Sequence, residues 1–358
     1  PLASPGIMGK APKWLLDPLG PLSIPPQHAM TIAPWMLRFW RASRPDRFRA
    51  GVKAQSELMG LSQRAVERQI ERVKGEALIQ REGQLQLYDS ETAFHASKAE
   101  WDLRDQHGIP FELLTTSDAI AEIQPGISPK FTHAGFTPTW MNVVDPLTWN
   151  LHVARAFVQA GGTFEQRDIR ALGQDSSQAV LDTSEGSVRC DFVVVAGGAT
   201  SHHLAKTLGD NFPLETERGY NTSLPAGAFD LRTHLTFSTH GFVVTKINGG
   251  ARVGGAVELG GLKLPPNYQR SQTLLNKAAT FLPGLKTDGG TQWMGFRPSL
   301  PDSMPVIDRS PLANRVIYAF GHGHSGLTQS SATAELVGDK LTDRRSEIDT
   351  APFKATRF

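Results

Sequence analysis

The hydrophobic positions along the chain follow a helical period in some stretches and a strand period in others. Over residues 52–74, apolar side chains recur at every third or fourth position with glutamate and arginine between them, which predicts an amphipathic helix. Residues 91–107 and 146–160 predict two more helices, and the second has a proline in its first turn and two glycines at its end. A short helix should also begin at Ser117, whose hydroxyl we expect to cap it.

Alternating or β-branched runs predict strands in much of the remaining chain. The run FVVVA, residues 192–196, is continuously apolar, which is typical of a strand buried on both faces. The other expected elements are a hairpin over residues 76–90 with its turn at Glu82-Gly83, a strand over 163–166, a three-stranded meander over 167–191, short strands over much of 214–300, and one helix near 269–281. The order is a mixed α/β region, a β-rich insertion and a return to α/β.

Composition and charge exclude several classes of protein. The chain has 358 residues, 39% of them hydrophobic and 20% charged, which is ordinary for a globular protein and long enough for two domains. Its formal net charge of +2, from 37 basic and 35 acidic residues, argues against a dedicated nucleic-acid binder with a concentrated basic face. Cys190 is the one cysteine, so an intramolecular disulfide is excluded and a cysteine-based zinc site is not indicated.

The distribution of apolar residues also bears on location. No apolar run reaches the roughly 18–20 residues of a membrane span, and we expect a cytoplasmic protein. Residues 34–49, PWMLRFWRASRPDRFR, are basic and amphipathic. They fit a short helix packed on the body of the protein, which we favour, or a peripheral contact with the inner membrane, where a quinone could accept electrons.

The stretch YAFGHGHSGLTQSS, residues 318–331, contains the pattern G-x-G-x-x-G between an apolar run and a helix-like stretch. A dinucleotide-binding turn would need a second strand after the helix and an acidic residue about 20 positions further on. Asp343 has that spacing but lies in no strand pattern. A metal site would use His322 and His324, yet no second cluster of ligands is visible. A third interpretation is a helix N-terminus that donates backbone N–H groups to an electron-rich ligand, or a turn without any ligand.

The surrounding motifs carry a resemblance to a known family. Residues 293–308, WMGFRPSLPDSMPVID, are followed closely by GHGHSGLT. Upstream stand MNVVDPLTWNLHVARAFVQAGGTF, FVVVAGGATSHHLAKTLG and PLETERGYN, in that order. Together, over about residues 135–358, these stretches resemble the FAD-dependent D-amino-acid oxidase and dehydrogenase family, which includes glycine oxidase and sarcosine oxidase. The detail is most similar to the small-subunit type of bacterial D-amino-acid dehydrogenase.

The resemblance implies a fold of two intertwined parts. One is a Rossmann-like FAD/NAD(P)-binding domain of α/β class, and the other is a β-rich substrate-binding domain. The implied segments are a connecting segment at 1–50, a helical region with part of the substrate domain at 51–140, the middle of the FAD domain at 141–213, the antiparallel sheet of the substrate domain at 214–294, and the end of the FAD domain at 295–358. The family's opening strand, G-x-G-x-x-G turn and helix is not found near Pro1. We therefore expect the chain to begin just after that unit, with the natural protein or a partner chain supplying it.

The resemblance also implies a reaction and a set of site residues. Hydride would move from the substrate α-carbon to N5 of a non-covalently bound flavin, giving an imine that hydrolyses to a keto acid and ammonia. The substrate residues would be Arg297, whose planar fork suits a carboxylate, with Arg218 and Tyr220 as second contacts. In each case a purely structural role is the alternative. The flavin residues would be Ile169, Ala196, Gly197, Gly198, Gly323, His324, Ser325, Gly326, Leu327 and Thr328. No catalytic acid or base and no metal is expected.

Several alternatives stay open at the level of sequence. The chain could be a subunit or fragment that cannot bind FAD alone, or an NAD-dependent dehydrogenase that uses its C-terminal glycine loop. The substrate could be a D-amino acid, a sarcosine-type amine, an imino acid or an opine. The electron acceptor could be oxygen or a quinone.

Overall fold

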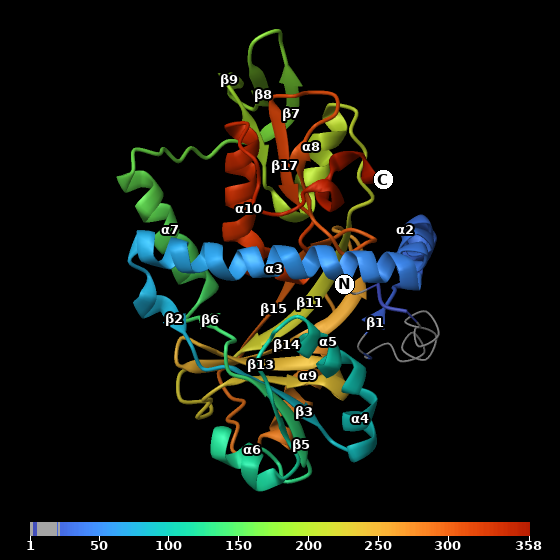
Figure 1. Ribbon diagram of the computed structural model, residues 1–358, viewed down its shortest axis with the longest axis vertical. Coiled ribbons are helices and arrows are strands. Elements are labelled where there is room, and N and C mark those ends of the chain that lie inside the picture. Colours follow the sequence, from blue (N-terminus) through green and yellow to red (C-terminus); the bar gives the residue numbers. More distant parts are fainter. Residues whose placement is uncertain (1–2, 6–19, 21) are drawn as a thin grey trace.

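The computed structural model describes residues 3–5, 20 and 22–358. Within this part of the chain the strands form four sheets. The nine-stranded sheet lies at one end of the molecule, and two three-stranded sheets lie at the other (Figure 1). Of the connecting segment expected at residues 1–50, residues 1–2, 6–19 and 21 lie outside the described part.

The upper part contains a three-stranded sheet in the order β10-β17-β16 and the three-stranded meander β7-β8-β9. Strands β10 and β17 are parallel, and β16 is antiparallel to β17. The bounds are β7 Ile169–Gln174, β8 Ala179–Thr183, β9 Gly186–Cys190, β10 Val193–Val195, β16 Val306–Arg309, β17 Val316–Phe320, α8 Ser201–Thr207 and α10 Gly326–Leu341. The apolar side of these strands packs into a core with Leu300 and Ala205.

The lower part is a nine-stranded mixed sheet of the described residues, in the order β15-β11-β14-β13-β12-β3-β5-β4, with β1 beside β14. Its bounds are β1 Leu22–Ser23, β3 Gln84–Tyr88, β4 Glu112–Leu114, β5 His133–Thr137, β11 Glu215–Ser223, β12 His234–Phe237, β13 Phe242–Ile247, β14 Gly250–Leu259 and β15 Thr291–Ser299. Helices α4 Glu91–Ala96, α5 Lys98–Gln106, α6 Ser117–Ile123 and α9 Gln269–Phe281 flank it. A large apolar cluster between α9, α6 and the sheet forms its core.

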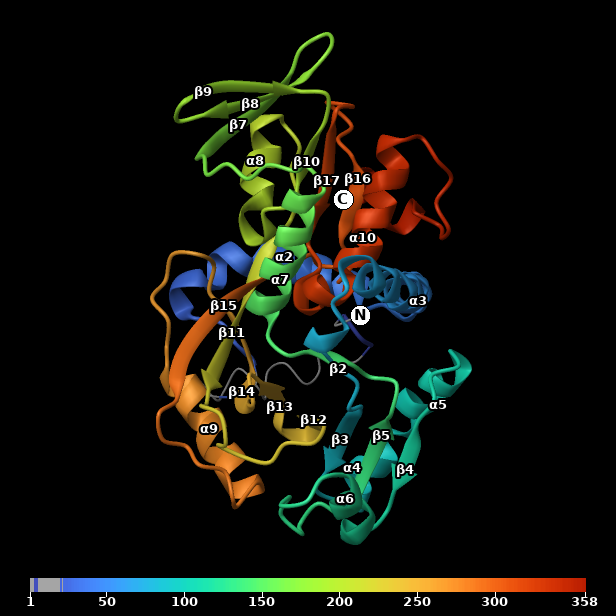
Figure 2. The ribbon, with the colours of Figure 1, turned by 90° about the vertical axis from the view of Figure 1, so that its left-hand side faces the viewer.

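Helix α3, Pro45–Val73, crosses the molecule between the two parts (Figures 1 and 2). Its apolar stripe, which includes Leu58 and Leu61, packs against Leu336 of α10. The other helices and strands at this level are α2 Ala29–Ala42, α7 Pro146–Gln159, β2 Ile79–Gln80 and β6 Asn142–Val143. Strands β11 and β15 rise from the lower sheet toward the upper part in both views, so they connect the two.

Most of the expected helices and the meander are confirmed. The helix expected over 52–74 is α3, which begins earlier, at Pro45. The helix expected over 146–160 is α7, whose N-cap Asp145 accepts a hydrogen bond from Thr148 N at 2.9 Å. The short helix at Ser117 is present, but its cap is the preceding residue, Thr116, whose Oγ1 accepts from Ala119 N.

The expected hairpin over residues 76–90 is wrong. Its two halves belong to different sheets, because β2 pairs with β6 whereas β3 lies between β12 and β5. Gly83 does turn the chain, with φ 73°, but the strands on either side find partners far away in sequence. Residues 163–166 form no strand either.

The run at residues 192–196 does contain a strand, β10, but it is not buried on both faces. Val193 and Val195 are buried, whereas Val194 is 41% exposed. Among the described strands β10 has β17 as its neighbour; Ile317, the register partner of Val194, is buried against α10, but Val194 itself lies at the edge of the described sheet and stays partly exposed.

Candidate functional site

Strand β11 presents two chemically different faces. Successive residues of a strand point to opposite sides of the sheet. Glu217 therefore shares a face with Arg297 of β15, which lies directly opposite it in the antiparallel register. Arg218 and Tyr220 occupy the other face, and the Arg218 guanidinium lies over the ring of Phe296, its own partner in the register. The structure thus separates the predicted substrate residues into two groups.

The Arg297 side chain lies across β11 at Gly219, where the strand carries no side chain. A Cβ atom on Gly219 would sit 2.0 Å from Arg297 Nη2, so only glycine allows the guanidinium to lie flat against the strand. Nη1 donates to the carbonyl oxygen of Ala256 at 3.2 Å, which is the one hydrogen bond of this side chain within the described residues. Since a guanidinium has five N–H donors, Arg297 keeps a planar pair of donors for a carboxylate.

The carbonyl that receives this hydrogen bond is held by strained backbone. Ala256 has φ 57°, a conformation that residues with a side chain rarely adopt. The pairing of β11 with β14 is irregular here, because β14 contributes one residue more than β11 between the pairs Arg218–Glu258 and Tyr220–Gly255. Such a bulge re-aims the backbone locally. Strain of this kind persists where the surroundings enforce it, and it is common at functional sites.

A buried carboxylate stands beside Arg297. Glu217 is 4% exposed, and its Oε2 lies 2.5 Å from Nε2 of His324 in the glycine loop. Burial alone would raise the pKa of Glu217, but the hydrogen bond and charge of His324, the Ser299 hydroxyl and the charge of Arg297 together lower it. Burial lowers the pKa of Arg297, and the Glu217 carboxylate opposes that effect. Glu217 is therefore a charged group of the site, and no sequence motif pointed to it.

Two of the predicted flavin loops meet at the strand that carries Arg297. The 3-10 turns Gly198–Thr200 and Gly323–Ser325 both lie against β15. An isolated antiparallel bridge between Ser299 and His322 joins the end of β15 to the start of the glycine loop. Predicted residues from 197–198 and from 323–326 are thus brought together beside the predicted substrate arginine.

The remaining predicted flavin residues are more dispersed. Leu327 and Thr328 are exposed in the first turn of α10. Ala196 follows β10 directly. Ile169 begins β7, packs partly against the upper core and pairs with Thr183, so it is not brought to β15.

The glycine loop is not a dinucleotide fingerprint of the βαβ type. Within the described chain, α10 is followed by turns and no strand, so Asp343 lies on no second strand. The metal interpretation also finds no support there. His322 is bonded to Thr333 Oγ1 at 2.9 Å, and no group of three or more potential ligands gathers anywhere in the described residues.

Two features of these loops suit an electron-rich ligand such as the flavin that the resemblance implies. Helix α10 begins at Gly326, and the side chain of its N-cap residue Ser325 makes no capping hydrogen bond. The first N–H groups of a helix have no intrahelical acceptor, and the helix dipole makes that end attractive to an electron-rich group. Beside the other loop, the fully buried hydroxyl of Ser201 has no hydrogen-bond partner among the described residues. Both loops therefore offer donors without protein acceptors.

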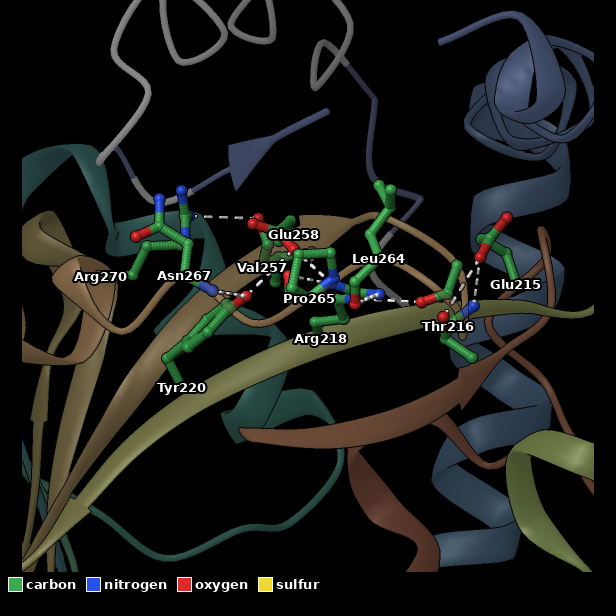
Figure 3. A network of polar contacts seen from close by, with 11 residues as sticks. Glu215, Thr216, Arg218, Tyr220, Val257, Glu258, Leu264, Pro265, Asn267 and Arg270 are labelled. Atoms are coloured by element: carbon green, nitrogen blue, oxygen red, sulfur yellow. Dashed lines mark hydrogen bonds and ion pairs between the residues drawn. The ribbon is translucent and has the colours of Figure 1, made fainter. Parts of the chain in front are cut away.

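On the opposite face of β11, Arg218 and Tyr220 form a closed polar network (Figure 3). Arg218 is 0% exposed, and it donates from Nε to Gly261 O, from Nη1 to Glu258 Oε1 and Pro265 O, and from Nη2 to Leu264 O. Tyr220 donates to Glu258 Oε1 at 3.0 Å and accepts from Asn267 N. These contacts fasten the loop over residues 260–267 to the sheet and favour the structural alternative for Arg218 and Tyr220.

Comparison with known proteins places the chain among flavoenzymes. Residues 26–340 match the family described as FAD dependent oxidoreductase. A D-amino-acid oxidase of Bradyrhizobium diazoefficiens is 31% identical over all of this chain and 86% of its own length. A D-amino acid dehydrogenase of Rhizobium rhizogenes is 28% identical over all of this chain and 87% of its own length.

Solved structures agree in fold. Glycine oxidase from Geobacillus kaustophilus superposes with a TM-score of 0.75, at 23% identity, over 83% of this chain and 81% of its own. L-proline dehydrogenase from P. horikoshii gives a TM-score of 0.73, at 19% identity, over 84% and 82% of the two chains.

The fold and the family match thus define a flavin-dependent oxidoreductase with a mixed α/β architecture. The chain belongs to the FAD dependent oxidoreductase family, and FAD is the cofactor that this membership implies. The resemblance drawn from the sequence motifs is confirmed.

Proposed function

We propose that this protein oxidises the C–N bond of a D-amino acid and releases a keto acid and ammonia after hydrolysis of the imine. The observation that carries the proposal is Arg297, a guanidinium with unused donors, on a strand against which two loops lie: one leads into the N-terminus of α10, and the other lies beside the buried Ser201 hydroxyl, which has no partner among the described residues. The names of the curated relatives, a D-amino-acid oxidase and a D-amino acid dehydrogenase, support the same substrate class.

Each part of the chain has a defined task in this proposal. Arg297 binds the substrate carboxylate through two parallel N–H···O hydrogen bonds, and Gly219 leaves room for the guanidinium. The turns at 198–200 and 323–325 and the N-terminus of α10 hold the flavin. When bound, FAD accepts the hydride of the substrate α-carbon. The donors at the start of α10 favour negative charge, so they stabilise electron-rich groups placed there.

The first test is the visible absorbance spectrum of the purified chain supplied with FAD. We expect flavin bands that bleach anaerobically with members of a D-amino-acid panel and much less with the L-enantiomers. Bleaching by no amino acid or amine would contradict the proposal. A strict requirement for NAD without flavin bands would support the alternative of an NAD-dependent dehydrogenase. An absence of bound flavin would support the alternative of a subunit that cannot bind FAD alone.

We further propose that α2 makes a peripheral contact with an anionic membrane surface. One face of α2 is buried through Ile32, Trp35 and Phe39. A second apolar stripe points to solvent, with Met30 87%, Leu37 48% and Trp40 51% exposed. Beside this stripe, five arginines gather within twelve residues against one aspartate, at positions 38, 41, 44, 47 and 49. Exposed aromatic and aliphatic residues flanked by arginine suit the interface of an anionic bilayer.

Helices of the described residues are too short or too polar to cross a membrane. A surface contact of this kind would bring the flavin site near a quinone as electron acceptor. In a sedimentation assay, we expect the protein to pellet with vesicles rich in anionic lipid and to reduce quinone analogues there. The double variant Leu37→Glu, Trp40→Glu should stay in the supernatant, and Leu312→Glu, which changes another exposed leucine, should still pellet. Equal behaviour of the two variants would contradict the assignment of α2.

A further inference from the structure

The imidazole of His324 is held by one nitrogen and open at the other. Nε2 lies 2.5 Å from Oε2 of Glu217, and the side chain is 37% exposed. Nδ1 has no hydrogen-bond partner among the described residues. Glu217 lies opposite Arg297 in the register, and the loop that carries His324 lies against β15, so the imidazole belongs to the same site as Arg297.

The carboxylate decides which nitrogen carries the proton of a neutral imidazole. An ionised carboxylate can only accept hydrogen bonds, so Nε2 must donate to Glu217. Nδ1 then carries a lone pair. The lowered pKa of Glu217 agrees with an ionised side chain. A buried carboxylate behind an imidazole also stabilises the imidazolium that forms when the open nitrogen takes up a proton.

The position of the pair matches the second charged group of an amino acid. Glu217 is the residue directly opposite Arg297 in the register of β11 and β15. The ammonium group of an α-amino acid is attached to the carbon next to its carboxylate. A substrate whose carboxylate is bound by Arg297 therefore has its ammonium group close to this pair. An ammonium must lose a proton before its nitrogen lone pair can assist removal of hydride from the α-carbon.

We propose that His324 is the proton acceptor for the substrate ammonium and that Glu217 is its positioning residue; this inference rests on the proposed amino-acid oxidation. One N–H bond of the ammonium breaks, its electron pair stays on the substrate nitrogen, and the proton bonds to Nδ1 of His324. The charge of the resulting imidazolium is balanced by Glu217. No oxidant or reductant takes part in this step.

The first experiment measures the tautomer directly and needs no substrate. Nitrogen NMR of the FAD-loaded protein labelled at histidine, with the His324 signals assigned by comparison with His324→Asn, reports which ring nitrogen carries hydrogen. We expect the neutral imidazole to be the Nε2–H tautomer, and this preference to be lost in Glu217→Leu. A neutral imidazole in the unaltered protein with its one proton on Nδ1 would overturn the proposal.

The second experiment measures the rate of flavin reduction against pH, with an amino acid that bleaches the unaltered protein. At neutral pH we expect His324→Asn to lower this rate about 100-fold, in the range of general base catalysis. The deficit should shrink as the pH approaches the pKa of the free ammonium, because the substrate then arrives already deprotonated. A deficit that high pH does not restore, or no deficit at all, would overturn the proposal.

Two further variants separate positioning from simple packing. Glu217→Gln keeps an acceptor for Nε2 and should retain more activity than Glu217→Leu, which keeps none. His240→Asn breaks a similar imidazole–carboxylate pair, with Asp89 at 2.9 Å, away from β15, and should leave the rate and its pH profile unchanged. If no amino acid bleaches the unaltered protein, the proposed function fails; if bleaching occurs but His324→Asn is equally fast, only this inference fails.

Discussion

The two arginines of neighbouring strands, Arg218 and Arg297, have the same chemistry and opposite environments. Arg218 is fully buried, and its donors are taken up by one carboxylate and three backbone carbonyls. Arg297 is partly buried and makes one hydrogen bond within the described residues. Both arginines lie in sequence motifs that resemble the family. They differ in how many of their N–H donors the fold leaves without an acceptor. A saturated arginine holds the protein together, whereas an unsaturated one can hold a ligand.

The largest effect should follow from removing the saturated arginine. Arg218→Met would leave Glu258 buried without its cation and three carbonyls without donors, at a cost of about 3–5 kcal/mol in the free energy of unfolding. Urea denaturation would measure this loss. Adding Glu258→Gln to the same chain should recover part of it, because the uncompensated charge is gone. Unchanged stability together with a large rise in KM would instead assign Arg218 to the substrate.

The next effect concerns the unsaturated arginine. Arg297→Lys replaces a planar fork by a point charge, and we expect kcat/KM to fall about 100-fold while the melting temperature changes little. Arg252→Lys is a matched control, since Arg252 is also partly buried and lies 5.0 Å from the ring centroid of Trp293. The comparison would break if Arg297→Lys destabilised the fold as strongly as Arg218→Met.

His322 of the glycine loop should make the stability of the protein depend on pH. His322 is half-buried, and desolvation of its ring lowers its pKa to about 4. Below about pH 6.5 the unfolded chain takes up a proton that the folded His322 does not, so the free energy of unfolding falls as the pH falls from 6.5 to 4. We expect His322→Gln to reduce this slope by about 1.4 kcal/mol per pH unit. Parallel pH profiles of stability for the two proteins would count against a neutral His322 in the folded protein.

The smallest effect should come from the edge of the network around Arg218. Tyr220→Phe removes one hydrogen bond to Glu258 and one from Asn267 N, while the ring stays in place. We expect a loss of about 1–2 kcal/mol in the free energy of unfolding, with kcat/KM nearly unchanged. A selective fall in kcat/KM would return Tyr220 to the substrate site.

The sequence predicts elements better than it predicts partners. Helices α3 and α7 follow from periodicity and capping residues, which act over a few positions. The expected hairpin at Gly83 failed because the partners of β3 are distant in sequence: β5 at residues 133–137 and β12 at residues 234–237, the second about 150 positions away. Exposure of Val194 could not be foreseen either, since it depends on which elements cover β10.

The same limit applies to the site. Motif order identified Arg297 and the glycine loop, because both lie within short recognisable stretches. Glu217 carries no motif of its own, and its contact with His324 joins residues 107 positions apart. Its one local signal is a carboxylate in the middle of a strand that is otherwise buried. Likewise, Arg218 and Arg297 could not be told apart without knowing which acceptors surround each.

The order in which strands occur along the chain also affects how the protein is made. Strand β3 is complete at residue 88, yet its neighbour β12 begins at residue 234, and β10 waits for β17 from residue 193 to residue 316. A ribosome releases the N-terminal end first, so Leu85 and Leu87, both fully buried in the finished protein, emerge long before one of their covering strands exists. Neither sheet can close until most of the polypeptide has been translated, and this long interval favours chaperone binding over early folding during synthesis.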